Sequence, residues 1–343
     1  MKPTAHATRE AATLCAEFPL ASTRELARML RSRHPGLYAS ENSARVTVQR
    51  VRAEGNQHNI PSQDTRHIDP ADVVPAATDP AERAWPSLPK PKAEFDHWGA
   101  VELSGDHRAL VLSDIHLPYY DRGALAVALE MGRRRDATLV LLNGDVADHY
   151  AVSHWQNDPR RRDFRAEVES VQQFLAALRE GFPKARVVWK LGNHEERLER
   201  YLVAKAPELL GLQVLDMGGL YGCAGRGVEL VRDMKPVKLG KLFVVHGHEY
   251  RFAIQNPVNP ARGLFLRAKT LALCGHFHQT SQHSERNLEQ SVVSTWSTGH
   301  LGEPHPAYRP LNNWNHGFAF VETNSAGAFE VENYRVINGT CYR

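Results

Sequence analysis

Five short apolar runs recur along the middle of the chain, and each is followed at once by a turn with polar side chains. Four of the runs span 109–112, 139–142, 242–245 and 271–274, and a slightly more polar fifth spans 186–191. Runs of this length that are rich in Leu and Val predict buried β-strands. The polar groups are therefore expected to cluster on turns at one edge of a sheet, where open α/β sheets bind ligands.

Side chains that bind metals dominate these five turns. In chain order they are Asp114-Ile115-His116, Gly144-Asp145, Gly192-Asn193-His194-Glu195, His246-Gly247 and Gly275-His276-Phe277-His278. The set offers carboxylate, imidazole and amide groups without a thiolate, which suits Mn, Fe or Zn better than a sulfur-rich site. Two metals roughly 3.5 to 4 Å apart supply a nucleophile and neutralise a phosphoryl group. A shared carboxylate offsets the repulsion between neighbouring dications, and Asp145 is the candidate for this bridge.

The ordered blocks resemble the signature of the calcineurin-like metallophosphoesterases, over roughly residues 107–300. With its N-terminal helical module, the chain resembles phage and bacterial members in particular. The resemblance implies an α/β fold, a four-layer α/β/β/α sandwich with the metals at the sheet edge. It also implies two metal sites, one formed by Asp114, His116, Asp145 and His278, the other by Asp145, Asn193, His246 and His276.

The same resemblance implies a phosphoric ester hydrolase with two divalent metal ions, of which Mn²⁺ is expected first and Fe or Zn are alternatives. In this family a metal-bridging hydroxide attacks the phosphorus of a mono- or diester in line. His194 would contact the phosphate or protonate the leaving oxygen, and a His beside the ligands is well placed for general acid work. Asn193, His194 and Arg197 are the expected substrate contacts. Glu195 would orient His194 or cap the following helix.

Several positions near these blocks leave alternatives open. His248 follows His246 by two residues, and the family pattern favours His246 as the ligand. Asp148 and His149 either line the substrate cleft or lie in a loop exposed to water. Arg197 opens an amphipathic helix, where it either forks onto phosphate oxygens or belongs to a solvated face paired with neighbouring glutamates.

Basic segments point weakly toward a polyanionic substrate. The cluster Arg160-Arg161-Arg162-Asp163-Phe164-Arg165 either attracts nucleic acid or is ordinary solvated surface. Arg133 to Arg135 lie at the end of a helix that begins near Asp121. There their positive charges interact favourably with the helix C-terminus. With 42 Lys and Arg against 39 Asp and Glu, the net charge of +3 is too mild to indicate a nucleic-acid partner.

The first 56 residues predict a small helical module. Ser22 to Glu25 form a capping-box pattern that opens a helix with Leu26, Met29 and Leu30 on one face. A second helix is expected over 41–54, with Ala44, Val48 and Val51 at helical spacing beside Arg45, Gln49 and Arg52. Two such helices resemble a helix-turn-helix module, although the connection over 34–40 is longer than the motif requires. DNA or RNA contact, oligomerisation and protein docking are the alternatives for this module.

The predicted domains are the helical module at 1–56, a proline-rich linker at 57–98 and the phosphoesterase domain at 99–343. Strands are expected over 291–300, 317–322 and 328–335, where they would complete the second sheet. The loops at 299–306 and 314–317 are polar enough to form a cleft wall or are ordinary connections.

Composition limits the remaining possibilities. Cys15, Cys223, Cys274 and Cys341 show no close spacing, which favours a reduced, cytoplasmic protein over a disulfide framework. No signal peptide and no run of about 18 apolar residues is evident, so no membrane partner is expected. The leading interpretation is a phosphoesterase acting on a phosphate ester, with nucleic acid as the first substrate class. A protein or small-nucleotide phosphatase and a catalytically silent nucleic-acid-binding adaptor are the alternatives.

Overall fold

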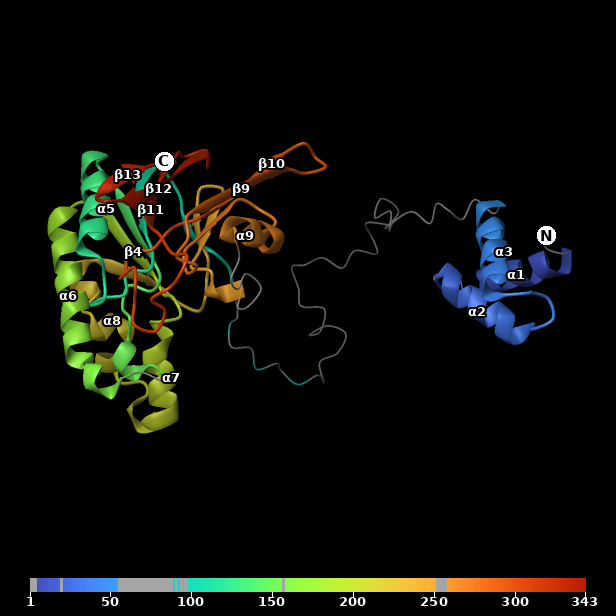
Figure 1. The fold of residues 1–343 in the computed structure, drawn as a ribbon, viewed down its shortest axis with the longest axis horizontal. Helices are drawn as coiled ribbons and strands as arrows, with labels where there is room; N and C mark the ends of the chain where they lie inside the picture. The colour runs from blue at the N-terminus through green and yellow to red at the C-terminus, as the bar shows by residue number, and fades with distance from the viewer. Residues whose placement is uncertain are drawn as a thin grey trace. The chain divides into compact units, whose positions relative to one another are not determined.

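The chain forms two compact units, Met1–Ala93 and Glu94–Arg343, in a computed structural model (Figure 1). The structure describes residues 5–18, 21–54, 89, 92, 95, 98–155, 158–250 and 258–343. Most of the predicted linker at 57–98 lies outside the described residues. The two units are described separately below.

Three helices form the first unit: α1 (Ala5–Glu17), α2 (Thr23–Arg33) and α3 (Glu41–Glu54). The predicted capping box is present, because Ser22 accepts a hydrogen bond from the Glu25 amide and the Glu25 carboxylate accepts one from the Ser22 amide. The predicted apolar faces of α2 and α3 are buried against each other and against α1. Only two helices were expected from the sequence. Half of the buried stripe of α1 is alanine, which gives little apolar contrast with its neighbours.

The second unit contains two sheets among its described residues. The seven-stranded sheet has the order β13-β12-β11-β2-β3-β4-β5, and the six-stranded sheet has the order β1-β6-β7-β8-β10-β9. The strands of the first sheet are β2 (His107–Leu112), β3 (Leu139–Asn143), β4 (Arg186–Lys190), β5 (Val228–Val231), β11 (His316–Thr323), β12 (Phe329–Ile337) and β13 (Thr340–Tyr342). Those of the second are β1 (Val101–Leu103), β6 (Val237–Leu239), β7 (Leu242–Val245), β8 (Ala272–Cys274), β9 (Ser281–Arg286) and β10 (Val292–Ser297).

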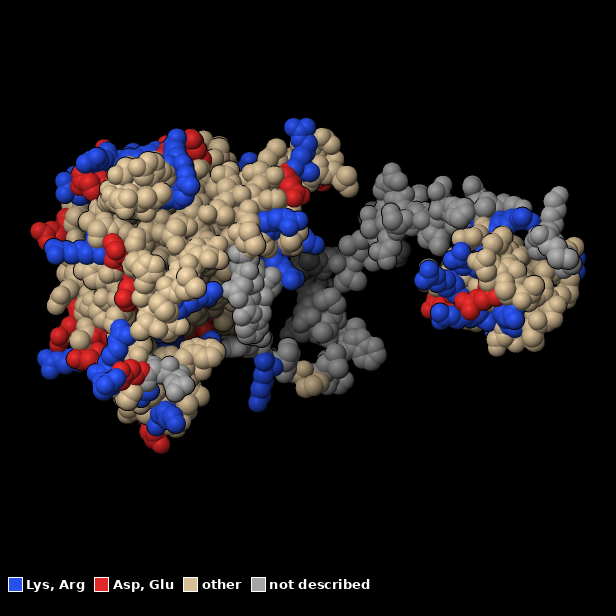
Figure 2. All heavy atoms as spheres, viewed as in Figure 1, with Lys and Arg blue, Asp and Glu red and all other residues tan. Residues whose placement is uncertain are grey.

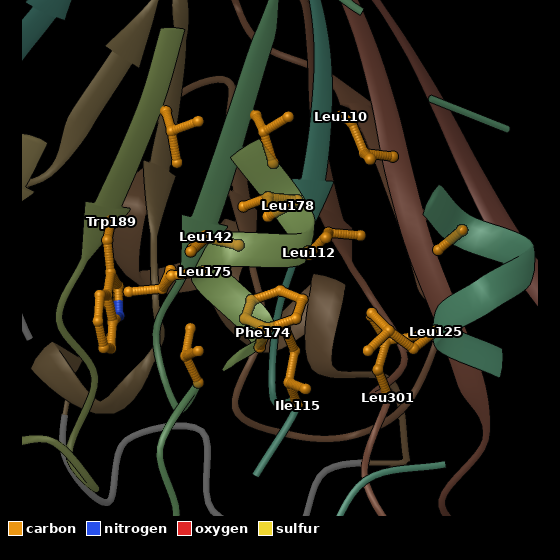
Figure 3. Packing of buried hydrophobic residues seen from close by; sticks show 14 of the residues in the cluster. Leu110, Leu112, Ile115, Leu125, Leu142, Phe174, Leu175, Leu178, Trp189 and Leu301 are labelled. Atoms are coloured by element: carbon orange, nitrogen blue, oxygen red, sulfur yellow. The ribbon is translucent and has the colours of Figure 1, made fainter. Parts of the chain in front are cut away.

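Alternate side chains of the central strands divide the core into layers. In β2, Leu110 and Leu112 pack with the helices α5 (Arg122–Arg134) and α6 (Phe164–Gly181), and Figure 3 shows these leucines near α6. Ala109 and Val111 instead pack between the two sheets. This follows from the two-residue period of a strand. The helix α9 (Pro260–Ala268) covers the outer face of the six-stranded sheet. The result is the α/β/β/α sandwich that was predicted.

All five apolar runs are strands, but their placement corrects one expectation. β2, β3 and β4 run parallel in the seven-stranded sheet, whereas β7 and β8 run parallel in the six-stranded sheet. The metal-binding turns therefore come from two facing sheets and not from the edge of one.

The late strands correct a second expectation. Only β10 joins the six-stranded sheet, while β11 pairs antiparallel with β2 and β12 pairs with β11. The sequence predicted these strands, but a strand's own residues carry no information on which strand it will pair with.

Candidate metal centre

The candidate ligands lie on turns whose backbone is held in an uncommon conformation. Asp114, His116, Asp145, His276 and His278 all have positive φ values, between 53° and 67°. Non-glycine residues rarely adopt this left-handed region, and such positions concentrate at functional sites. The turns bring the ligand atoms of these side chains close to one another.

Asp114, His116 and His278 form the first group of candidate ligands, with their ligand atoms within 4.8 Å of one another. The His278 Nε2 atom lies 3.2 Å from Asp114 Oδ1 and 3.3 Å from His116 Nε2. All three side chains are nearly or fully buried. Two of these groups follow β2 in one sheet, and the third follows β8 in the other.

Asp145, His246 and His276 form the second group, again within 4.8 Å of one another. The His246 Nε2 atom lies 3.2 Å from Asp145 Oδ2 and 3.2 Å from Asn193 Oδ1. Asn193 thereby joins the second group through its amide oxygen. His248, the alternative to His246, instead contacts the Glu196 carboxylate at 3.1 Å.

Asp145 connects the two groups. Its carboxylate also lies within 4.8 Å of ligand atoms of His116 and His194. One of its oxygens, Oδ1, accepts a hydrogen bond from the His194 amide at 2.9 Å, while Oδ2 faces His246. A carboxylate in this position can bridge two neighbouring cations.

Partners outside the centre fix two of the imidazoles in the orientation a ligand needs. His116 Nδ1 lies 3.1 Å from the Asp148 carboxylate, and His246 Nδ1 lies 2.8 Å from the Asn143 carbonyl. Because a carbonyl and a carboxylate both accept, each Nδ1 is the donor, and each Nε2 is left facing the centre. Such an outer partner commonly orients metal-binding histidines.

The pKa shifts in the centre are those of a site that binds cations. Burial lowers the pKa of His246, but the Asp145 and Asp114 carboxylates outweigh burial and raise it to about 10. Burial lowers the pKa of His276 to about 3, which leaves a neutral imidazole able to bind metal. The pKa values of both aspartates are lowered by their histidine neighbours in spite of burial. Two carboxylates, four imidazoles and one amide oxygen thus form a donor set that fits two divalent ions.

Glycines at the turns allow the strands to approach this closely. A Cβ atom added to Gly192 would lie 2.4 Å from Asp145 Oδ1, and one added to Gly275 would lie 2.6 Å from Asp114 Oδ2. Any side chain at either position would displace a candidate ligand.

Glu195 has a role that the sequence did not indicate. Its buried carboxylate accepts hydrogen bonds from four backbone amides, those of Asp145, Val146, Ala147 and Gly192, at 2.7 to 3.0 Å. Its side chain makes no capping bond at the start of α7 (Glu196–Lys205). Both expectations for Glu195 were therefore wrong: it fastens the turn after β3 to the turn after β4.

A buried ion pair supports the turn after β7. Lys190 is 1% exposed, and its Nζ atom lies 2.5 Å from the Glu249 carboxylate. That carboxylate also accepts hydrogen bonds from the amides of His246 and Gly247. Burial raises the pKa of Glu249, but Lys190 and the neighbouring histidines outweigh it and lower the pKa to about 2. A Lys at the end of the apolar run 186–191 was the available sequence signal for such a buried partner.

His194 lies beside the centre with both ring nitrogens engaged. Its Nδ1 donates to the Asp148 carbonyl at 2.9 Å, and its Nε2 accepts from the Arg197 guanidinium at 2.8 Å. The same Arg197 donates to the Asp148 carbonyl. The alternative of a solvated Arg197 paired with Glu196 or Glu199 does not hold, because its partners are in the site.

The segment after Asp145 is buried and does not form a water-exposed loop. Asp148 lines the pocket beside His116. His149 is fully buried: its Nδ1 donates to the His194 carbonyl at 3.1 Å, and its Nε2 accepts from Tyr221 Oη at 2.6 Å. Burial lowers the pKa of His149 to about 4, which keeps this ring neutral as a support behind His194.

Two of the four arginines in the basic cluster at 160–165 form local ion pairs. Arg160 pairs with Asp158, and Arg165 pairs with Glu169. Arg161 instead lines the pocket that opens beside His116 and His278. The loops at 299–306 and 314–317 line the same pocket through His300, Glu303 and Trp314, which favours the cleft-wall interpretation.

Comparison with known proteins gives the following matches. The sequence profile described as calcineurin-like phosphoesterase matches residues 107–301, more than half of the chain. The Gene 54 protein of Mycobacterium phage L5 is 25% identical over 226 residues, which are 62% of this chain and 88% of that protein.

Solved structures also resemble the chain. Vacuolar Protein Sorting 29 from Cryptosporidium parvum is 14% identical, with a TM-score of 0.38 over 69% of this chain and 95% of that one. A dimetal phosphatase from Danio rerio is 12% identical, with a TM-score of 0.34 over 68% and 96% of the two chains. At these TM-scores the structures add nothing to the family match. Among the described residues, no helix is both long and apolar enough to cross a membrane.

Proposed function

The chain belongs to the calcineurin-like phosphoesterases and is a metal-dependent phosphoric ester hydrolase, and from this premise we propose which residues perform the reaction. One divalent ion would be held by Asp114, His116, Asp145 and His278. The second would be held by Asp145, Asn193, His246 and His276. We take Mn²⁺ as the first metal to test, with Fe and Zn as alternatives, because the donors are oxygen and imidazole nitrogen.

When bound, two such ions neutralise the phosphoryl oxygens and make hydroxide available near neutral pH for in-line attack on a phosphate mono- or diester. The protein contributes orientation. Asp145 and Asn193 lie at the end of two parallel strands, where Glu195 fixes the turn that carries Asp145. His116 and His246 present Nε2 because Asp148 and the Asn143 carbonyl hold their Nδ1 atoms.

His194 is the residue proposed to act on the ester. Its Nδ1 proton is held by the Asp148 carbonyl, so Nε2 is the atom that faces the substrate. Because Nε2 accepts from Arg197 in the structure, it would first have to take up a proton from solvent, which it could then deliver to the leaving oxygen. Arg197 holds His194 in place and provides a guanidinium for the phosphate oxygens. Together with Asn193, these two residues are the proposed substrate contacts.

The observation that carries this proposal is the position of Asp145, whose carboxylate lies within 4.8 Å of ligand atoms from both groups. A catalytically silent nucleic-acid-binding adaptor would have no need of a complete donor set around a shared carboxylate. The centre is compatible with nucleic acid, phosphoprotein and small-nucleotide substrates, and nucleic acid remains the first class to test.

The helical unit gives less support to nucleic-acid binding than its composition suggested. Arg28 pairs with Glu41, Arg33 pairs with Glu17, and Arg52 donates to the Ala21 carbonyl and the Thr23 hydroxyl. On the face drawn in Figure 2, red Glu side chains lie among the blue Arg side chains of this unit. We propose that any nucleic-acid contact uses the exposed positions of α3, such as Gln49 and Arg50.

The test of the proposed function is hydrolysis of a chromogenic phosphomonoester and of its matching diester in the presence of Mn²⁺. Wild type, Asp145→Ala and the exposed control Glu289→Ala are compared. We expect activity in wild type and in the control, and loss of at least about a thousandfold in Asp145→Ala because both metal sites lose a ligand. Activity that survives Asp145→Ala would contradict the assignment of the metal ligands. The absence of hydrolysis in all three proteins would favour the nucleic-acid-binding adaptor.

A further inference from the structure

A pocket next to the metal centre has a polar base and aromatic walls. His116, Asp148 and His278 form its base, so it opens directly over the first group of candidate ligands. The walls come from three segments that are far apart in the sequence. One wall carries Tyr119, which follows β2, with Tyr150 and Arg161, which follow β3, and the other wall carries Tyr308 and Trp314.

The first wall is a pair of tyrosines with an arginine over them. The Arg161 guanidinium carbon lies 5.1 Å from the centre of the Tyr119 ring and 5.3 Å from that of Tyr150. The two rings meet edge to face, 5.7 Å apart. Arg161 is exposed, so one face of its planar guanidinium packs on the rings and its donors remain available at the pocket.

The second wall is a succession of rings that leads away from the metal ligands. Trp314 packs edge to face on His278 at 4.4 Å, and the Tyr308 ring lies 6.2 Å from Trp314. The Arg309 guanidinium lies 5.5 Å from the Trp314 ring. Tyr308 is 70% exposed. A large aromatic side chain left exposed at the rim of a catalytic pocket has no role in the core and suggests a contact with a ligand.

We propose that these walls bind the base of a nucleotide whose phosphate lies at the metal centre, so that the substrate is a nucleotide or a single strand of nucleic acid. This inference rests on the proposed function, since it places the scissile phosphate beside His116 and His278. Every base offers a flat π face to an aromatic ring, and the Arg161 guanidinium complements a phosphate backbone. Recognition by stacking is tolerant of sequence.

The geometry favours a nucleotide over a phosphotyrosine side chain. In phosphotyrosine the ring is bonded directly to the ester oxygen, so it would end near Trp314, one ring away from His278. A base is carried beyond a sugar and extends farther, toward Tyr308. A phosphoserine peptide offers no ring to either wall.

The experiment compares substrate pairs that differ only in the base. One pair is adenosine 5′-monophosphate and ribose 5-phosphate, followed by phosphate release. The other is the p-nitrophenyl diester of thymidine 5′-phosphate and the same diester of 2-deoxyribose 5-phosphate. For the full chain with Mn²⁺, we expect kcat/KM to be about 5- to 100-fold higher for the base-bearing member of the pair that is cleaved.

Variants test whether the walls cause this preference. Tyr308→Ala and Arg161→Ala should each reduce the preference, measured as the ratio of kcat/KM for the two members of the pair, at least about threefold. Tyr308→Phe should retain the preference because the ring remains. Tyr342→Ala, which removes another exposed tyrosine, should have no effect. The inference would be overturned if the kcat/KM values of the base-bearing and base-free members were nearly equal in wild type. It would also be overturned if their ratio were unchanged in both Ala variants.

Two further outcomes separate this inference from the proposed function. If a phosphotyrosine peptide is cleaved faster than any nucleotide and depends on Tyr308, the hydrolase assignment stands and the nucleotide assignment fails. If no ester is hydrolysed, the proposed function fails. The inference is then tested by measuring the affinities of the two monoesters by calorimetry. Tighter binding of adenosine 5′-monophosphate that is lost in Tyr308→Ala would support the aromatic walls, and equal binding would refute them.

Discussion

Two glutamates, Glu195 fully buried and Glu249 largely buried, hold the two halves of the candidate metal centre in different ways. Glu195 supports the half built on the seven-stranded sheet and binds four backbone amides. Glu249 supports the half built on the six-stranded sheet and binds two amides together with Lys190. Burial and the Asp145 carboxylate raise the pKa of Glu195, whereas Lys190 and nearby histidines lower that of Glu249 in spite of burial.

The different partners of Glu195 and Glu249 show two ways in which a carboxylate can be stabilised near a cluster of ligands. Amide dipoles alone hold Glu195, so removing its charge leaves no opposite charge behind. Glu249 is matched by a full cation, and removing its charge would leave Lys190 buried without compensation, a more costly situation. The two supports should therefore respond differently to the same conservative substitution.

The largest effect is expected for Glu249→Gln. This change keeps the shape but leaves the Lys190 ammonium buried without an anion, which typically costs about 3 to 5 kcal/mol. The free energy of unfolding of the second unit, measured by urea denaturation, should fall accordingly. The double variant Lys190→Met with Glu249→Gln should recover part of the loss. A single variant within about 1 kcal/mol of wild type would show that Lys190 is not charged there.

A second prediction separates holding a metal from acting on the ester. His194→Ala should slow turnover by about a hundredfold or more, because the proposed proton donor is lost. Metal content, measured by elemental analysis, should stay near wild type, unlike in His246→Ala, which removes a proposed ligand. Loss of metal from His194→Ala would instead assign His194 to the ligand set, next to Asp145.

A smaller effect is expected for Glu195→Gln. The amide nitrogen of Gln cannot accept, so one of the two oxygen positions can no longer bind its pair of backbone amides. We expect a loss of about 1 to 3 kcal/mol in the free energy of unfolding, less than for Glu249→Gln because no buried cation is exposed by the change. If Glu195→Gln proves the more destabilising of the two, the contrast between the supports is wrong.

The smallest effect concerns a third buried glutamate, Glu167, which accepts a hydrogen bond from the Ala151 amide. Its other oxygen has no hydrogen-bond partner among the described residues. Burial, with the Asp148 carboxylate, raises its pKa from 4.5 to about 7. Because the folded pKa is the higher one, ionisation disfavours the folded state, and wild type loses stability as the pH rises from about 4.5 through 7.

Glu167→Gln removes this ionisation and keeps an acceptor for Ala151. Relative to wild type, the variant should gain about 1 to 2 kcal/mol at pH 8 and much less at pH 5, as measured by thermal unfolding at both pH values. Glu169→Gln on the exposed side of the same helix is the control. An equal gain at both pH values would mean that Glu167 is ionised throughout, as Glu249 is.

The apolar runs predicted the strands well because a buried strand is a local pattern. The positions of β2, β3, β4, β7 and β8 followed from runs of Leu and Val, and the capping box at Ser22 from four residues in sequence. The sheet to which each strand belongs did not follow, because the residues of β11 and β12 predict strands without indicating their partners. Helix α1 was missed because half of its buried stripe is alanine.

The supports of the site were hidden for a related reason. Glu195, Glu249 and Lys190 are ordinary charged residues in the sequence, and their burial depends on chain segments up to 59 residues away. Tyr308 and Trp314 likewise gained a role only when the loop that carries them was placed beside His278.

By itself, the sequence determined the strands, the glycine-bearing turns and the chemical identity of the donors, because these depend on residue type and local spacing. Only the tertiary structure decided which donors share a neighbourhood, which charged groups lose their water and which aromatic rings face the pocket. Those properties arise when two sheets pack face to face, and packing depends on contacts between segments that no local pattern encodes.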